Sequence, residues 1–263
     1  MTTTSSTAFR ITCIQTHPAM LDVAGNVAHQ VELIRAAAAE GSKLIVLPEC
    51  STTGWVFESR AEAATVAESV PDGPTCTTWL SLCRELDIHI VAGIVERQGD
   101  RQYNSAVLLG PAGHIGTFRK AHLWAVEKEF YDPGDLGFPV FETPLGRIAM
   151  HICYDGWFSE SYRIPALCDA DLLCVPANWV PIPNQPDHMP KMAESARAAP
   201  GRRVETSGAG AFVGTAVGGA VVGIGVRAVR RRGASALPGR SSRARTHCAV
   251  AFGVSPPSFS AWP

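Results

Sequence analysis

The sequence predicts a layered α/β domain, and three features predict it. Short apolar segments of strand length alternate with longer segments whose apolar residues recur at helical spacing. Two pairs of the short segments are joined by compact turns and are typical of hairpins. The length of 263 residues is enough for one large α/β domain or two small ones. Alternating strands and helices with hairpins between them favour layers of helix packed on sheet.

The first third of the chain carries the alternation most clearly. Residues 9–15 alternate apolar and polar side chains and predict a strand. Asp22 can cap a helix over residues 23–40, whose Val and Ile residues fall on one face. Residues 43–47 form an apolar run before Pro48, typical of a buried central strand, and Glu49 lies just past its end. We further expect helices over 60–68 and 75–86 and a strand over 88–95.

The two predicted hairpins lie in the middle of the chain. Strands over 104–109 and 115–119 flank the turn at 110–113, and Lys120 closes the second strand. Strands over 140–143 and 147–152 flank the turn at 144–146, and Cys153 ends the second of these. A helix over 157–168, a strand over 172–176 and a helix beginning within 187–199 complete the expected order.

The bulk composition narrows the possible partners and compartment. A net charge of −1 gives no reason to expect nucleic acid or an anionic membrane surface as partner. The first ten residues lack the basic start and apolar core of a signal peptide, so the expected location is the cytoplasm. The eight Cys lie in apolar runs without a CxxC pair, which indicates buried thiols or a single reactive one.

Three reactive residue types, Glu49, Lys120 and Cys153, stand at the ends of predicted strands. Strand ends are where loops of α/β folds converge. A thiol that attacks a carbonyl or nitrile carbon needs a base, which a carboxylate can be. A lysine can stabilise the oxyanion of the tetrahedral intermediate, and a turn after Cys153 would aim the backbone N–H of Tyr154 at that oxyanion. Each residue alone is more typical of core or surface.

The local sequences around these residues resemble the three signature blocks of the nitrilase superfamily of carbon–nitrogen hydrolases. They are IVLPECSTTGW, FRKAHLW and GRIAMHICYDGWFSESYR, in the family's order, and YDPGDLGFPVFETPLG also matches. The resemblance implies a four-layer αββα sandwich, assembled as a homodimer or higher homo-oligomer. It implies Glu49 as general base, Lys120 as the stabilising cation and Cys153 as nucleophile. It also implies a second glutamate, which is Glu127 in EKEFYDPGD, with Glu129 as the alternative.

The resemblance also implies the class of reaction. Thiol-dependent hydrolysis of a non-peptide carbon–nitrogen bond in a small amide or N-carbamoyl compound would release ammonia or amine without metal or cofactor. Family nitrilases carry Trp-Glu after the cysteine, whereas this chain has Tyr154 and Asp155, so it is more similar to the amidase branches. Carbamoylases place arginines where Gly156 and Trp157 stand here, so a carboxylate-binding role is not expected. A nitrile substrate remains the alternative.

Three further residues are expected around the substrate. Trp157, Asn178 and Trp179 lie where the family shapes its pocket, and a tryptophan wall suits an aliphatic or aromatic substrate body. Packing within a loop is an equally good interpretation of Trp179. The His residues, including His122 and His151, show no ligand spacing and are read as packing or loop residues.

The composition changes after residue 195, where the family pattern stops. Residues 196–263 contain one acidic residue, no Lys, and many Arg, Gly, Ala, Pro and Ser. We therefore divide the chain into a hydrolase domain over 1–195, incomplete at its C-terminal side, and an atypical segment over 196–263. Three interpretations of that segment are open: a frameshifted or chimeric end of a GC-rich gene, a transmembrane helix over 208–226, and a divergent folded end.

Two consequences follow for the chain as a whole. We expect residues 196–263 not to form the closing strands of the sandwich. A catalytically impaired or unfolded gene product therefore stays open beside the active hydrolase. Pro165 lies inside the predicted helix over 157–168 and also favours an impaired product, because helix interiors disfavour proline.

Overall fold

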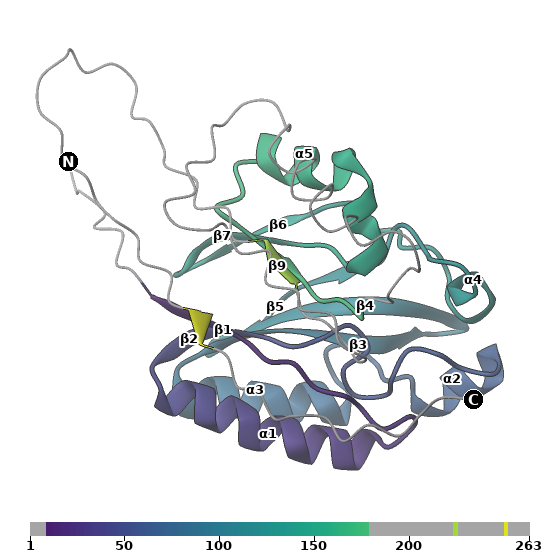
Figure 1. Cartoon of the computed structure of the whole chain (residues 1–263), viewed down its shortest axis with the longest axis horizontal. Coiled ribbons are helices and arrows are strands. Elements are labelled where there is room, and N and C mark those ends of the chain that lie inside the picture. Colours follow the sequence, from purple (N-terminus) through teal and green to yellow (C-terminus); the bar gives the residue numbers. More distant parts are fainter. Residues whose placement is uncertain (1–8, 179–222, 226–249, 252–263) are drawn as a thin grey trace, which may run out of the picture.

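The computed structural model describes residues 9–178 and two short strands at 223–225 and 250–251. Within these residues the order is helix layer, sheet, sheet, helix layer, which confirms the predicted αββα sandwich (Figure 1). One sheet contains β1 (Arg10–Cys13), β2 (Ser42–Val46), β3 (His89–Gln98), β4 (Arg101–Gly110), β5 (Gly113–Arg119) and β10 (Val250–Ala251). The other contains β6 (Val140–Thr143), β7 (Gly146–Met150), β8 (Leu172–Val175) and β9 (Gly223–Gly225). The helices are α1 (Val23–Ala39), α2 (Arg60–Val66), α3 (Pro74–Leu86), α4 (Glu127–Phe130) and α5 (Ser159–Leu167), with a 3-10 turn, η1 (Cys153–Trp157).

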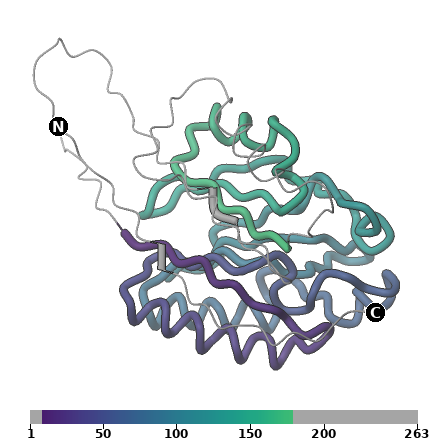
Figure 2. The backbone as a smooth tube through the Cα atoms, in the orientation of Figure 1, coloured from purple at the N-terminus to yellow at the C-terminus, as the bar shows by residue number. Residues whose placement is uncertain are grey.

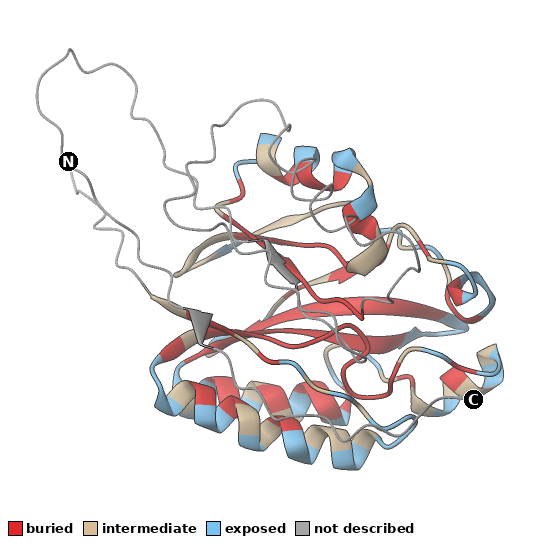
Figure 3. Cartoon of the chain, in the orientation of Figure 1, coloured by how far each residue is buried: buried red, intermediate tan, exposed pale blue. Residues whose placement is uncertain are grey.

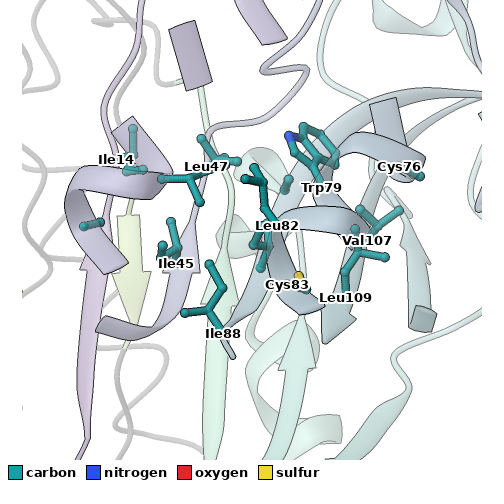
Figure 4. Close-up of a cluster of buried hydrophobic side chains, with 14 of the residues drawn as sticks. Ile14, Ile45, Leu47, Cys76, Trp79, Leu82, Cys83, Ile88, Val107 and Leu109 are labelled. Atoms are coloured by element: carbon teal, nitrogen blue, oxygen red, sulfur yellow. The ribbon is translucent and has the colours of Figure 1, made fainter. Parts of the chain in front are cut away.

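Helices α1 and α3 cover the outer face of the larger sheet. Figure 4 shows Trp79, Leu82 and Cys83 of α3 over Ile45 and Val107 of the strands. The apolar face of α1, predicted from its spacing, contributes the buried Ile34 and Ala37 to the same cluster. Asp22 caps α1 as expected, since its side chain accepts a hydrogen bond from the N–H of Gly25 at 3.0 Å.

The two sheets pack face to face through a second apolar cluster. Its members come from both sheets and include Leu44 and Val91 on one side and Ile148, Met150 and Cys174 on the other. Helix α5 covers the outer face of the smaller sheet, where Tyr162 packs near Ala149. Figure 3 shows the buried sheets between helices whose outer faces are exposed. Residues 10–119 form α1, α2, α3 and five strands of the larger sheet, and residues 140–175 form α5 and three strands of the smaller sheet (Figure 2).

The elements predicted up to residue 176 are present, and β3 and the segment after Cys153 differ in extent from the prediction. Strand β3 was predicted to end at residue 95 but continues to Gln98 and forms a long hairpin with β4. Glu96 can lie within this strand because it is buried in an ion pair with Arg119. The predicted helix over 157–168 is a 3-10 turn followed by the nine-residue α5. Pro165 lies in the last turn of α5, where it removes one hydrogen-bond donor without interrupting a longer helix.

Two segments of the atypical C-terminal region add strands to the sandwich. Strand β9 pairs antiparallel with β8, and β10 pairs parallel with β1. We expected residues 196–263 not to form the closing strands of the sandwich, whereas backbone pairing at these two segments extends one edge of each sheet. The predicted helix within 187–199 lies outside the described residues, as does the 208–226 span except for β9.

Candidate active site

Strand ends from both sheets meet at the candidate site. Glu49 follows the end of β2 by three residues, and Lys120 directly follows β5. These two strands run parallel, since β2 is parallel to β3 and β5 reverses direction twice from it. Cys153 follows the end of β7 in the smaller sheet by three residues. The larger sheet thus carries the carboxylate and the amine, and the smaller sheet carries the thiol.

Lys120 lies between two buried carboxylates. Its Nζ donates to Oε1 of Glu49 at 2.7 Å and to Oε2 of Glu127 at 2.6 Å. Glu49, Lys120 and Glu127 are each at most 2% exposed. Glu127 sits on α4, and Glu129 of the same helix is exposed, so the structure brings Glu127 rather than Glu129 to Lys120. One cation facing two carboxylates leaves a negative excess that further donors must balance.

Asn104 of β4 supplies two of those donors. Its side-chain amide donates to Oε1 of Glu49 and to Oε1 of Glu127, both at 2.7 Å. Its backbone carbonyl accepts the N–H of Lys120 at 2.8 Å. Asn104 was not among the site residues predicted from the sequence, although a polar residue at the start of the apolar stretch NSAVLLG was a signal for it.

Cys153 adopts a positive φ of 41° at the start of η1. This conformation is uncommon for a residue with a side chain and is typical of functional turns. Its N–H donates to the carbonyl of Pro176 at 3.0 Å, which fixes the turn on the end of β8. The half-buried thiol lies 3.8 Å from the carbonyl oxygen of Asn178, and the negative charge of Glu49 acts on it.

Asn178 links the base to the nucleophile. Its backbone N–H donates to Oε2 of Glu49 at 2.8 Å, and its side-chain amide donates to the carbonyl of Glu49 at 2.6 Å. The sequence singled out Asn178 as a pocket residue, whereas its described contacts orient Glu49. Trp179, the neighbouring predicted pocket residue, lies outside the described residues.

The turn after Cys153 is anchored by a buried aspartate. Asp155 accepts the N–H of Ile152 at 3.1 Å and the N–H of His122 at 2.8 Å, and the His122 ring lies 2.8 Å away. The turn that carries the thiol is thereby bound to the segment that carries Lys120. Tyr154, the predicted oxyanion donor, is partly buried on this turn, and Trp157 at its end is 37% exposed with its ring 6.1 Å from that of Tyr154.

Two glycines let backbone segments approach the site residues closely. A Cβ on Gly93 of β3 would lie 2.5 Å from the Cα of Glu49 and from the carbonyl oxygen of Pro48. A Cβ on Gly134 would lie 2.1 Å from the carbonyl oxygen of Arg119, and the Gly134 N–H donates to the carbonyl of Lys120 at 2.9 Å. Only glycine fits at these two positions, where the chain packs directly against the backbone beside Glu49 and Lys120.

The charges of the cluster shift the pKa values of its members. Burial on its own disfavours the charged amine, but Glu49, Cys153 and Glu127 together raise the pKa of Lys120 well above its ordinary value. Burial raises the pKa of Glu127, and Glu49 adds to this while Lys120 opposes it. Burial and Glu49 raise the pKa of the Cys153 thiol well above its ordinary value, against the effect of Lys120. The resting thiol is therefore protonated and the lysine charged.

No group of three or more His, Cys, Asp or Glu in the described part of the chain is arranged to hold a metal ion. No helix formed by the described residues combines the length and apolar character that a membrane crossing needs.

Known proteins share this arrangement at the level of family and fold. The model of the carbon–nitrogen hydrolase family matches residues 10–202. A nitrilase from Pyrococcus abyssi is 42% identical over 181 residues, which are 69% of each chain. An N-carbamoylputrescine amidase from Solanum lycopersicum is 34% identical over 59% of this chain and 54% of its own length. The chain thus spans little more than half of some curated relatives.

Solved structures agree with the fold. A carbon–nitrogen hydrolase from Helicobacter pylori superposes with a TM-score of 0.63 at 21% identity, over 77% of this chain and 76% of that one. An amidase from Nesterenkonia sp. superposes with a TM-score of 0.59 at 20% identity, over 72% and 74% of the two chains. Together with the family match over most of the chain, these likenesses show that the protein belongs to the carbon–nitrogen hydrolase family, the nitrilase superfamily.

Proposed function

We propose that this chain hydrolyses the carbon–nitrogen bond of a small amide or N-carbamoyl compound through an acyl-enzyme on Cys153. The observation that carries the proposal is the cluster at the ends of strands from two sheets, in which Lys120 contacts Glu49 and both act electrostatically on the Cys153 thiol. A thiol, a carboxylate base and a cation within one cluster are the groups that acyl transfer requires.

The first half of the reaction forms the thioester. Because the thiol is protonated at rest, Glu49 accepts its proton as the sulfur attacks the carbonyl carbon. The carbonyl oxygen becomes an oxyanion, which the ammonium of Lys120 and the backbone N–H of Tyr154 stabilise. The carbon–nitrogen bond then breaks, and the departing nitrogen takes the proton from Glu49 and leaves as ammonia or amine.

The second half restores the enzyme. Glu49 takes a proton from a water molecule, whose oxygen attacks the thioester carbon. The carbon–sulfur bond breaks, the thiolate recovers its proton from Glu49, and a carboxylic or carbamic acid leaves. Glu127 shares Lys120 with Glu49 and keeps the amine charged through both halves.

An amide rather than a nitrile is proposed because Tyr154 and Asp155 follow Cys153, where family nitrilases carry Trp-Glu. Asp155 occupies the position after Tyr154 and is buried in hydrogen bonds with Ile152 and His122. The rings of Trp55 and Trp124, on the loops after Glu49 and Lys120, meet edge to face at 5.7 Å and offer apolar surface for the substrate body. A nitrile is the second candidate, and the nitrilase from Pyrococcus abyssi, 42% identical, favours it.

The test compares matched substrates on one preparation of the full chain. Ammonia release is measured from an aliphatic or aromatic amide and from the nitrile with the same side chain. We expect faster turnover of the amide, no turnover by Cys153→Ala, and iodoacetamide labelling of the Cys153 peptide that the substrate slows. Activity that survives Cys153→Ala rejects the mechanism, and faster turnover of the nitrile rejects the amide assignment.

An inactive chain is the remaining candidate. The abrupt change of composition after residue 195 favours it, because that change is typical of a shifted reading frame in a GC-rich gene. Resequencing the locus and reading the other frames beyond Glu194 separates the candidates. A continuous family pattern in another frame, together with no ammonia release by the purified chain, would support the inactive form.

A further inference from the structure

The two glutamates of the site share Asn104 in the same way that they share Lys120. The amide nitrogen of Asn104 donates to one oxygen of each carboxylate at 2.7 Å, and Asn104 is fully buried. The amide orientation is fixed by chemistry, since the flipped side chain would place its oxygen against two carboxylate oxygens. The amide oxygen of Asn104 has no hydrogen-bond partner among the described residues, so its described side-chain hydrogen bonds are the two that it donates to the glutamates.

The hydrogen bonds divide the two oxygens of Glu49 unequally. Oε1 accepts from both Asn104 and Lys120, so both of its lone pairs are in use. Oε2 accepts from the backbone N–H of Asn178, whose carbonyl oxygen faces the Cys153 thiol. Oε2 therefore keeps one lone pair free of the described donors and is the oxygen of Glu49 that is left to accept the thiol proton.

We propose that Asn104 is a positioning residue of this site, which holds Glu49 and Glu127 as hydrogen-bond acceptors and directs the thiol proton to Oε2 of Glu49. Neither Lys120 nor Asn178 can do this alone. Lys120 takes one lone pair of Oε1 of Glu49 and contacts Oε2 of Glu127, so the second lone pair of Oε1 and the Oε1 of Glu127 are left to Asn104. Asn178 contacts Glu49 and has no hydrogen bond to Glu127 among the described ones.

Other charged and titratable groups face the same cluster and must be counted in any effect of pH. They are Lys120 from the end of β5, Glu127 from α4, Cys153 from η1, and the buried Cys50 and Tyr131 beside Glu49. None of them donates two neutral N–H groups to both carboxylates. Removing Asn104 therefore changes the proton balance of the whole cluster, and the cluster titrates as a unit.

The test uses Asn104→Asp, which keeps the shape of the side chain and replaces its donor with an acceptor. We expect kcat to fall by about 100-fold or more with KM changed by less than about threefold, because the altered contact is with the base. The acid limb of the pH–rate profile should move to higher pH by about one unit. Asn104→Ala removes the donors without adding charge and should shift the limb in the same direction, and it supplies the measurement if Asn104→Asp does not fold.

This inference rests on the proposed function, so a second measurement is chosen that needs no turnover. The rate of Cys153 alkylation by iodoacetamide, followed by peptide mapping, should fall by about tenfold in Asn104→Asp at fixed pH, because an added negative charge disfavours the thiolate. The exposed Cys168 serves as internal control and should react at the wild-type rate. Loss of activity in the wild-type chain would reject the proposed function and would leave the alkylation test of Asn104 intact.

Gln102 provides the matched control on the same strand. Its buried side chain donates to the carbonyl of Arg60 at 3.2 Å and has no contact with Glu49 or Glu127 among the described hydrogen bonds. Gln102→Ala should therefore keep the wild-type pH profile and Cys153 alkylation rate, whatever its stability. The proposal is overturned if the Asn104 variants keep the wild-type acid limb and alkylation rate, or if Gln102→Ala shifts them equally.

Discussion

A single methyl group on Gly93 is expected to inactivate the chain without removing any charged or reactive side chain. In Gly93→Ala the new Cβ would lie 2.5 Å from the Cα of Glu49 and from the carbonyl oxygen of Pro48, and 2.6 Å from the N of Cys50. All three are backbone atoms, so no side chain can rotate away. Restoring ordinary contact at 3.4 Å moves the Glu49 backbone by about 0.9 Å. A displacement of about 1 Å at a catalytic group costs about 100-fold in rate, and overpacking of this kind costs about 1–3 kcal/mol of stability.

The assay separates the two effects. Thermal unfolding measures stability, and steady-state ammonia release measures kcat on protein shown to be folded. Gly110→Ala in β4 is the matched control, because its Cβ would meet the ring of His89 at 2.8 Å, a side chain away from the site. We expect both variants to lose stability and Gly93→Ala alone to lose kcat. Wild-type kcat in a folded Gly93→Ala variant would refute the reasoning that β3 positions Glu49.

Three further predictions follow from the same contacts. Glu49→Gln and Lys120→Met should each lower kcat by about 100-fold or more, and a defect confined to KM would indicate a binding role instead. Lys120→Met should also destabilise the fold by about 3–5 kcal/mol, because two buried carboxylates lose their cation. Asp155→Asn should weaken the turn of Cys153 by about 1–3 kcal/mol, measured by urea unfolding, and an unchanged midpoint would mean that this carboxylate does not hold the turn. Burial lowers the pKa of His151 from 6.5 to about 4, so the unfolded chain binds more protons between these values and stability falls as pH drops through that window. His151→Phe should flatten this pH dependence of stability, and identical profiles would show that His151 does not cause it.

The sequence predicted those parts of the structure that depend on local pattern. Residues 43–47 were predicted to form a buried central strand. This is confirmed, since β2 lies between β1 and β3 with Leu44, Ile45 and Val46 fully buried. The apolar face of the first helix and its Asp22 cap were predicted from spacing and side-chain type alone. Glu49, Lys120 and Cys153 were predicted because each lies at or just past the end of a predicted strand and because the sequences around them resemble the signature blocks of the nitrilase superfamily.

The missing parts of the site depend on contacts between distant segments. Asn104 and Gly93 are both interior strand residues, and neither period nor propensity tells which neighbour faces them. Asn178 was expected near the pocket, but its bonds to Glu49 join residues that are 129 positions apart. Glu96 was expected beyond the end of its strand, and its burial is explained by Arg119 on a strand that is 23 residues away. Pairing across the fold, rather than local pattern, decides these cases.

The division of the site between two sheets has a consequence for how its geometry is maintained. Glu49 and Lys120 belong to the larger sheet and Cys153 to the smaller, so the distance between base and thiol depends on how the sheets pack. That packing is set by the apolar cluster of both sheets, in which Val46 and Met150 end the strands that lead to Glu49 and Cys153. Asn178 adds a polar link, because it binds Glu49 while its carbonyl faces the thiol. Close-packed interiors transmit small shifts, so the core between the sheets positions the reacting groups as directly as the hydrogen bonds do.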